Sequence, residues 1–206
     1  MSRTVDEARP GELREAILRY FVEHGLNNLS LRPLAKAVGS SPRGLLYHFG
    51  SKENMVIEVL AELRRRQRAA YAQVSGASFG EACREMWMQF SSADFEPQVR
   101  LFFEVYGIAL REPSLFESIL KPSIDDWLKF SEEQLRAEGL GRREARMMAT
   151  CVLAGFRGFM LDQCATHDRE RVGEAVNLWL ASLDAVWKSM ARTRSPASGA
   201  AKRPRS

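Results

Sequence analysis

The chain has 206 residues, of which 45% are hydrophobic and 27% are charged, and its formal net charge is +4. This composition is typical of a globular protein with one ordinary domain or two small ones. It excludes a membrane-spanning protein because no run of about 18 apolar residues occurs, and the start of the chain lacks the apolar core of a secretion signal. We therefore expect a cytoplasmic protein with free thiols at its three cysteines, which form no CxxC motif.

Positive charge is concentrated at the two ends of the chain. Residues 1–75 contain 12 Lys and Arg against 8 Asp and Glu, residues 76–190 contain 13 against 18, and residues 191–206 contain 5 against none. This distribution indicates that only part of the protein contacts a polyanion. Residues 192–206 hold too few apolar side chains to fold, and we expect a disordered basic tail there.

Helical periodicity dominates the first quarter of the chain. Apolar residues recur at intervals of three and four within residues 13–21, which predicts a first helix. Ser30 is the expected N-cap of a second helix, and Ser41 and Pro42 are the expected N-cap and first residue of a third. A fourth helix is predicted over Lys52–Gln73.

The remainder of the chain also has helical spacing, and no segment shows the alternation of a half-buried strand. Pro122 is expected to break or kink one of these helices. The predicted fold class is therefore all-α, with about nine helices. The further helices are expected at 79–92, 97–112, 114–138, 142–165 and 168–191.

The segment 40–53, SSPRGLLYHFGSKE, mixes apolar and hydrogen-bonding residues. On a helical wheel of about 100° per residue, Leu45, Leu46 and Phe49 share one narrow face. The opposite face consists of Arg43, Gly44, Tyr47 and His48. A capped helix, a tight turn and a short helix with such a face have the arrangement of a helix-turn-helix, whose second helix enters the DNA major groove.

Each residue type on that face suits a contact with DNA. Arg43 would donate two hydrogen bonds to a guanine, and Tyr47 and His48 would reach phosphates or base edges. Gly44 would let the helix approach the duplex closely. Lys52 lies at a helix start, where a cation opposes the macrodipole, and this placement indicates a phosphate partner. The candidate DNA-binding residues are Ser30, Arg32, Ser41, Pro42, Arg43, Gly44, Tyr47, His48 and Lys52.

Residues 29–55, LSLRPLAKAVGSSPRGLLYHFGSKENM, resemble the DNA-binding signature of TetR-type transcriptional regulators. Residues 100–113, RLFFEVYGIALREP, are similar to the sixth helix of many members. The resemblance implies a helix-turn-helix DNA-binding domain at 1–52, a helical ligand-binding and dimerisation domain at 53–191, and the tail at 192–206. It also implies a repressor released from a double-stranded DNA operator by a small apolar or amphipathic effector.

Aromatic and methionine side chains within residues 79–191 suit an adaptable apolar pocket, although each one alone is better explained as core. Glu104, Arg157, Asp162 and Gln163 interrupt apolar runs, and they either line the pocket or face solvent or a partner subunit. The candidate pocket residues are Met86, Trp87, Phe90, Phe102, Phe103, Tyr106, Trp127, Phe156, Phe159, Met160 and Gln163.

The last predicted helix is apolar on two sides and therefore needs both its own core and a second subunit. Six apolar residues from Val172 to Met190 recur at intervals of four and three, like a coiled-coil seam. Small residues on the preceding helix would allow close helix contact. We therefore predict a homodimer through these two helices. The candidate interface residues are Gly155, Gly158, Val172, Val176, Trp179, Leu183, Val186 and Trp187.

An enzyme is one competing interpretation, and a helical protein that binds RNA or an anionic surface is another. The sequence has no GxSxG, HExxH or P-loop motif, and its three histidines are scattered without metal-ligand spacing. We therefore expect no catalytic residue, cofactor or metal. The run Arg64-Arg65-Arg66 and the basic tail would suit RNA or an anionic membrane surface, but such runs are usually solvated helix faces or disordered arms.

Overall fold

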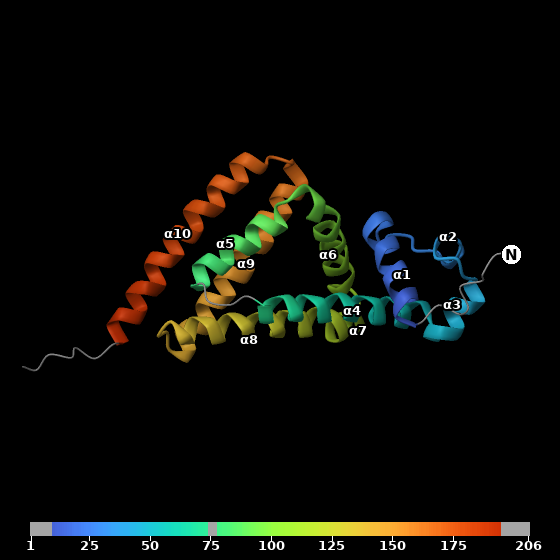
Figure 1. Cartoon of the computed structure of the whole chain (residues 1–206), viewed down its shortest axis with the longest axis horizontal. Coiled ribbons are helices and arrows are strands. Elements are labelled where there is room, and N and C mark those ends of the chain that lie inside the picture. The colour runs from blue at the N-terminus through green and yellow to red at the C-terminus, as the bar shows by residue number, and fades with distance from the viewer. Residues whose placement is uncertain (1–9, 74–77, 195–206) are drawn as a thin grey trace, which may run out of the picture.

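The computed structural model describes residues 10–73 and 78–194, and all regular structure in these residues is helical (Figure 1). The predicted all-α fold is confirmed, with nine α-helices of seven residues or more among the described residues. The predicted tail begins later than expected, because the last helix continues to residue 194, and residues 195–206 lie outside the described part of the chain. The elements are α1 (Pro10–His24), α2 (Leu31–Ala37), α3 (Pro42–Phe49), α4 (Lys52–Gln73), α5 (Phe79–Phe90), the 3₁₀ turn η2 (Ala93–Phe95), α6 (Glu96–Ala109), α7 (Pro113–Leu115), the π-helical turn η3 (Phe116–Leu120), α8 (Lys121–Ala137), α9 (Arg142–Thr166) and α10 (Arg169–Arg194).

The segment expected as one helix around Pro122 is helical throughout but irregular before the proline, and it consists of α7, η3 and α8 in direct succession. α7 has three residues, η3 has π-helical hydrogen bonding, and α8 begins at Lys121. Pro122 has no N–H to donate to the preceding turn. The regular pattern of α-helical hydrogen bonds is interrupted at the wider π turn η3, shortly before Pro122.

The helices form an elongated molecule in which α4 connects two groups (Figure 1). α1, α2 and α3 lie around the N-terminal end of α4, and α5, α6, α8, α9 and α10 form the body. α4 is continuous over 22 residues, which gives a length of about 33 Å at 1.5 Å per residue. The same helix therefore contacts both groups.

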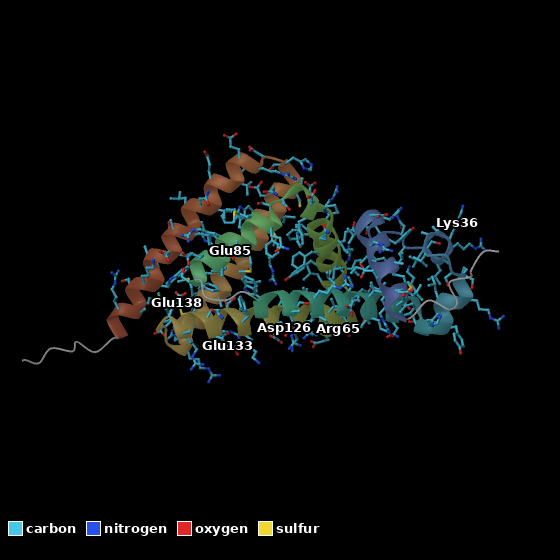
Figure 2. The ribbon with its side chains drawn as sticks, in the orientation of Figure 1. Lys36, Arg65, Glu85, Asp126, Glu133 and Glu138 are labelled. Atoms are coloured by element: carbon cyan, nitrogen blue, oxygen red, sulfur yellow. The ribbon has the colours of Figure 1, made fainter. Side chains whose placement is uncertain are left out.

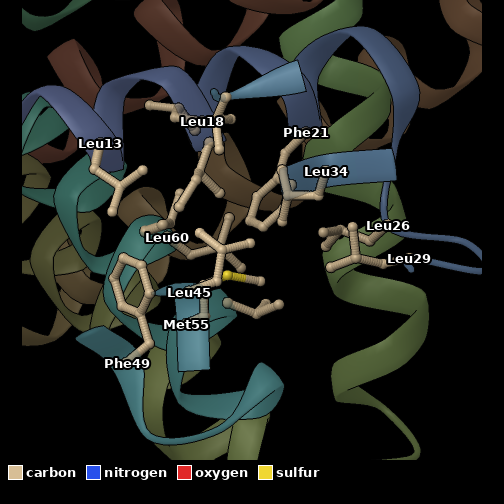
Figure 3. Close-up of a cluster of buried hydrophobic side chains, with 14 of the residues drawn as sticks. Leu13, Leu18, Phe21, Leu26, Leu29, Leu34, Leu45, Phe49, Met55 and Leu60 are labelled. Atoms are coloured by element: carbon tan, nitrogen blue, oxygen red, sulfur yellow. The ribbon is translucent and has the colours of Figure 1, made fainter. Parts of the chain in front are cut away.

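The first three helices pack around a core to which the body also contributes (Figure 3). Phe21 of α1, Leu34 of α2 and Leu45 of α3 are at most 1% exposed. Leu101 and Val105 of α6 are buried in the same cluster, which continues into α4. The helix-turn-helix thus rests partly on a helix of the body.

The body packs around a second core, into which α10 directs one face. Val172, Val176, Leu180 and Trp187 are at most 1% exposed. The interface predicted for Val172, Val176 and Trp187 is therefore wrong, because their own subunit encloses these side chains. Val186, in contrast, is 44% exposed and lies on the outer side of the helix.

Gly155 also makes an internal contact rather than the intersubunit contact that we predicted. Trp179 of α10 lies over Gly155, and a Cβ at this position would overlap the indole ring. The glycine therefore allows α9 and α10 to approach within one chain. Trp179 and Leu183 are partly buried against the body core, whereas Gly158 is exposed with nothing within 4 Å of its Cβ position.

Gly155→Ala should lower the free energy of unfolding by about 1–3 kcal/mol, because the added methyl group displaces Trp179. The matched control is Gly107→Ala within α6, where nothing lies within 4 Å of the Cβ position. This control should leave the protein unchanged or stabilise it by up to about 1 kcal/mol. Denaturant unfolding of both variants measures the difference, and equal stability of the two would contradict the packing of Trp179 on Gly155.

Candidate DNA-binding surface and internal cavity

α3 is a short helix whose ends are fixed by local hydrogen bonds. The Ser41 Oγ accepts a hydrogen bond from the Gly44 N–H at 2.9 Å, which confirms its predicted role as the N-cap. Gly50 follows the helix with a φ of 75°, which glycine adopts without strain. Asn54 of α4 donates its side-chain amide to the Phe49 carbonyl at 2.8 Å and thereby joins the two helices at their turn.

The two faces of α3 differ largely as the helical wheel predicts. Leu45 is 1% exposed and Phe49 is 4% exposed, and these two anchor the helix in the N-terminal core. Leu46 was expected on the same face but is 39% exposed, because the core encloses only the line through Leu45 and Phe49. The exposed residues of the opposite face are Arg43, Tyr47 and His48, with Gly44 partly buried among them.

The other predicted DNA-binding residues surround this face. Ser30, Arg32 and Pro42 are exposed, and Lys52 is partly buried in the first turn of α4. Lys36 was missed; it is exposed on α2 and projects from this end of the molecule (Figure 2). Its four-residue spacing from Arg32 on one helix could have indicated it. Figure 2 shows the labelled carboxylates Glu85, Glu133 and Glu138 of the body toward the other end of the molecule.

A cavity of about 620 Å³ lies between the N-terminal helices and the body, and its volume is typical of small-molecule sites. The sequence interpretation missed the wall formed by α1 and α4, which includes Leu18, Val22, Leu60 and Leu63. Helical periodicity marks these residues as buried but does not tell which neighbour buries them. Seven of the predicted pocket residues line the cavity: Met86, Phe90, Phe102, Tyr106, Trp127, Phe156 and Met160.

Two predicted pocket residues, Trp87 and Phe159, lie behind the cavity wall. Trp87 is 6% exposed and stacks on Phe156 with ring centroids 6.2 Å apart. Phe159 packs against Trp87 and Trp179, with centroids 6.3 Å and 5.3 Å away. These rings are core residues that support the wall, so their prediction as lining residues is wrong.

Two other predicted pocket residues also lie away from the cavity. Phe103 lines a separate depression between α6 and α9. Gln163 is buried and donates its Nε2 to the Ser91 carbonyl at 3.1 Å, at the end of α5. The sequence left open whether Asp162 lines the pocket or faces solvent or a partner subunit. In the structure, Asp162 forms an ion pair with Arg171 at 2.8 Å.

Arg157 and Tyr106 meet inside the cavity. The Arg157 guanidinium, on α9, lies 4.8 Å from the centroid of the Tyr106 ring, on α6. The Tyr106 Oη is buried and has no hydrogen-bond partner among the described residues. Burial raises the pKa of Tyr106, although the nearby Arg157 charge opposes this shift. The phenol therefore stays protonated near neutral pH and presents an O–H donor.

The described residues contain no cluster suited to a metal ion, and the buried thiol of Cys83 is poorly reactive. No three His, Cys, Asp or Glu side chains within residues 10–73 and 78–194 gather in a way that would hold a metal ion. The three cysteines are free, and burial raises the pKa of Cys83 to about 12, so this thiol is a poor nucleophile. In the same residues, no helix combines the length and apolar character needed to cross a membrane.

An exposed stripe of apolar and small residues runs along α9, at intervals of four and three. α10 adds Leu178, which is 72% exposed, and Val186. This surface, not the buried line of α10, is the outer apolar face of the two last helices. The stripe consists of Met147, Cys151, Ala154, Gly158, Leu161 and Ala165.

Residues 13–59 match the family model described as bacterial regulatory proteins, tetR family. The matched range includes α2, α3 and the turn between them. The N-terminal unit is a TetR-family domain. A curated relative, the HTH-type transcriptional repressor AcnR of Corynebacterium glutamicum, is 37% identical over 51 residues, which cover 25% of this chain and 27% of that protein. The match thus spans about a quarter of the relative's length.

Solved structures resemble most of the chain and not only its TetR-family domain. A transcriptional regulator from Rhodococcus sp. Rha1 superposes with a TM-score of 0.70 at 22% identity, over 90% of this chain and 97% of that chain. The multidrug binding protein EbrR, solved in complex with proflavin, superposes with a TM-score of 0.57 at 22% identity, over 84% of this chain and 98% of that chain. At this identity the likeness shows a shared fold.

Glu104 of α6 joins the TetR-family domain to the body. Its Oε2 accepts a hydrogen bond from the Leu26 N–H at 2.6 Å, just after α1 ends. Gly25 has a φ of 72°, and a Cβ there would lie 2.6 Å from the Glu104 Oε1, so the glycine makes room for the carboxylate. Glu104 stands between Phe102 and Tyr106, which line the cavity. The helix that walls the cavity thus also holds the turn before α2.

Glu104→Ala should lower the free energy of unfolding by about 1–3 kcal/mol, because the Leu26 N–H loses its charged acceptor. Glu104→Gln keeps an acceptor oxygen of nearly the same shape and should cost less. Denaturant unfolding of the two variants and the parent gives the ranking. A Glu104→Gln variant as unstable as Glu104→Ala would show that packing or charge elsewhere, not this hydrogen bond, is responsible.

Proposed function

We propose that this protein is a dimeric, non-catalytic transcriptional repressor that binds operator DNA through α3 and releases it when a small effector fills the cavity. The observation that carries the proposal is the construction of α3. Its inner side is anchored by Leu45 and Phe49, and its outer side presents Arg43, Tyr47 and His48 to solvent. An eight-residue capped helix with this outer face is suited to reading a major groove.

The residues around α3 divide into base-reading and phosphate-binding groups. Arg43 projects from the outer face and would donate two hydrogen bonds to guanine O6 and N7. Tyr47, which is 87% exposed, would reach a phosphate or a base edge. Lys36 and Lys52 flank the helix and would bind phosphates, which gives affinity without sequence preference. The similarity to the repressor AcnR, which is confined to a short segment, supports a role in repression.

The exposed stripe of α9 and the outer side of α10 would form a two-fold interface. Leu161 is 52% exposed and Leu178 is 72% exposed, so both would gain burial against a second subunit. Gly158, which has no neighbour within 4 Å of its Cβ position, would allow the two α9 helices to approach closely. Such a dimer would present two copies of α3, and reading successive major grooves requires them to be about 34–36 Å apart.

An effector in the cavity would act on α3 through α6. Phe102 and Tyr106 line the cavity, and Leu101 and Val105 of the same helix belong both to the cavity wall and to the N-terminal core. Glu104 ties the same helix to the turn before α2. A ligand that favours a different α6 position would change the spacing of the two α3 helices by its differential affinity for the two states. The complex of EbrR with proflavin supports the idea that this fold encloses aromatic ligands.

Arg43→Ala should lower affinity for the selected operator by about 1–3 kcal/mol and relax the preference at one base position. Lys52→Ala should instead weaken binding to all duplexes and flatten the logarithmic salt slope by about 1. The operator would first be obtained by selecting random duplexes with the purified protein. Fluorescence anisotropy at several salt concentrations then measures both variants.

Lys129→Ala is the matched charge control for the DNA experiment, because Lys129 is exposed on α8 in the body and should not affect binding. Single-stranded RNA and anionic vesicles test the competing class of partner. If both DNA-binding variants lose affinity equally for operator and random DNA, the division into base-reading and phosphate-binding residues is refuted. Stronger binding to RNA or vesicles than to duplex DNA would refute the proposed function.

Leu161→Glu and Leu178→Glu should convert the dimer to a monomer, because each places an unpaired charge in a desolvated interface. Leu110→Glu is the control, since Leu110 is 75% exposed at the end of α6, away from the stripe. Light scattering at micromolar concentration measures the mass, and circular dichroism checks the fold. A parent protein that is already monomeric, or variants that stay dimeric, would contradict this interface.

A further inference from the structure

Leu46 is an aliphatic side chain that α3 does not direct into the protein. It is 39% exposed, whereas Leu45 and Phe49 of the same helix are 1% and 4% exposed. Leu45 and Phe49 belong to the N-terminal core, and Leu46 does not (Figure 3). A single exposed leucine is ordinary on a protein surface, so its exposure alone does not indicate a partner. Its position among the other exposed residues of α3 does.

Arg43, Leu46 and Tyr47 lie on one side of α3. Residues three and four apart are neighbours on a helix surface, and all three of these side chains are exposed. Tyr47 is 87% exposed. Leu46 is therefore an apolar residue in a row of hydrogen-bonding residues, on the side of the helix that would enter the major groove.

The orientation of this row is fixed by the packing of α3. The helix contacts α2 and α4. Its start is held by the Ser41 cap, and its last carbonyl, that of Phe49, accepts a hydrogen bond from the Asn54 side chain at 2.8 Å. A rotation of α3 that buried Leu46 would have to expose Leu45 and break these contacts. The leucine thus stays on the outer side when the helix meets a partner.

The chemistry of leucine narrows the choice of partner group in a major groove. A leucine side chain neither donates nor accepts hydrogen bonds, so it cannot complement the donors and acceptors of the base edges. Beside such a group it would remove water without replacing the lost hydrogen bond. The C5 methyl of thymine is the apolar group that the four bases present in this groove. An apolar side chain there best complements a thymine.

Helix geometry limits where this thymine lies. Leu46 follows Arg43 by three residues, which is about 4.5 Å along the axis at 1.5 Å per residue. Successive nucleotides of one strand are about 3.4 Å apart along the duplex. The base pair next to Leu46 therefore lies within about two base pairs of the guanine that Arg43 would read.

We propose that Leu46 is a specificity-determining residue that contacts the C5 methyl group of one thymine in each operator half-site, within about two base pairs of the guanine bound by Arg43. This inference rests on the proposed function, because the thymine belongs to the duplex that α3 would read. Contact removes the methyl group and the exposed part of the leucine from water, which favours thymine over bases without a methyl group.

Removal of single methyl groups from the operator tests the contact on the full chain. Each thymidine of the selected operator is replaced in turn by deoxyuridine, which keeps every hydrogen-bonding group of the base and lacks only the C5 methyl. Fluorescence anisotropy should show one position per half-site at which the replacement weakens binding by about three- to tenfold. An operator without such a position would overturn the proposal. So would a sensitive position more than about two base pairs from the one at which Arg43→Ala relaxes the preference.

Variants assign the methyl contact to Leu46. Leu46→Ala should bind the operator about three- to tenfold more weakly and should bind its thymidine and deoxyuridine forms equally. Leu46→Gln covers the case in which the alanine variant does not fold, and it should also lose the difference between the two forms. Leu110→Ala is the matched control, because Leu110 is 75% exposed at the end of α6, and it should behave as the parent. Circular dichroism checks the fold of each variant.

Tyr47 is the other exposed residue of the row that could contact a methyl group. If the deoxyuridine effect persists in Leu46→Ala but disappears in Tyr47→Ala, the methyl group is read by Tyr47 and the proposal is refuted. Persistence in both variants would indicate a difference in DNA deformability and would refute it as well. Cytosine and 5-methylcytosine at the sensitive position give an independent comparison. The parent should prefer 5-methylcytosine, and Leu46→Ala should not.

Failure of this inference is distinguishable from failure of the proposed function. Binding of a selected operator, with no methyl effect that depends on Leu46, overturns the inference alone and leaves the repressor intact. Absence of affinity for any duplex overturns the proposed function and the inference together. A methyl effect that Leu46→Ala abolishes and Leu110→Ala retains supports both.

Discussion

The core beneath α3 is shared between the TetR-family domain and the body, and the other features of the molecule depend on this sharing. Phe21 and Leu45 enter it from the N-terminal helices, and Leu101 and Val105 enter it from α6. Close-packed interiors transmit displacements because they have few voids to absorb them. α6 packs on α1, and α3 packs on α2 and α4, so α6 reaches α3 through this shared core. The hydrogen bond from the Leu26 N–H to the Glu104 carboxylate adds a directional contact between α6 and the turn after α1.

The cavity lies at this junction and is walled by α1 and α4 as well as by the body. A ligand in it would contact the helices that support the recognition helix, with no intermediate layer. The arginine run at 64–66 takes part in the same junction. Arg64 pairs with Asp126, and Arg66 pairs with Glu15, while Arg65 binds Glu62 within α4. Side chains engaged in this way are poorly suited to an RNA or membrane surface, which weighs against the competing interpretation of the sequence.

The helix-turn-helix was largely predictable because its signals are local. The Ser41 cap and the glycine after α3 depend on residues within a turn or two of each other, and the four-residue spacing of Leu45 and Phe49 marks the inner face of the helix. The cavity was only partly predictable. Phe156 lines it, whereas Phe159, one turn further along the same helix, lies behind the wall against Trp179. Aromatic composition identifies the region of a pocket. Whether a given ring lines the cavity or lies behind its wall depends on helices that are distant in sequence.

α10 separates most clearly what the sequence determined from what the tertiary structure decided. The sequence determined a long helix that is apolar on two sides and therefore needs two partners, and it determined the capped recognition helix. It did not determine which side of α10 faces inward, since Val172 fits both the predicted seam and the observed buried line. The packing of Trp187 against Phe79, with centroids 5.7 Å apart, and of Trp179 over Gly155 selects the inner face. Periodicity is a property of one segment, whereas burial depends on the shape of the surfaces that the segment meets.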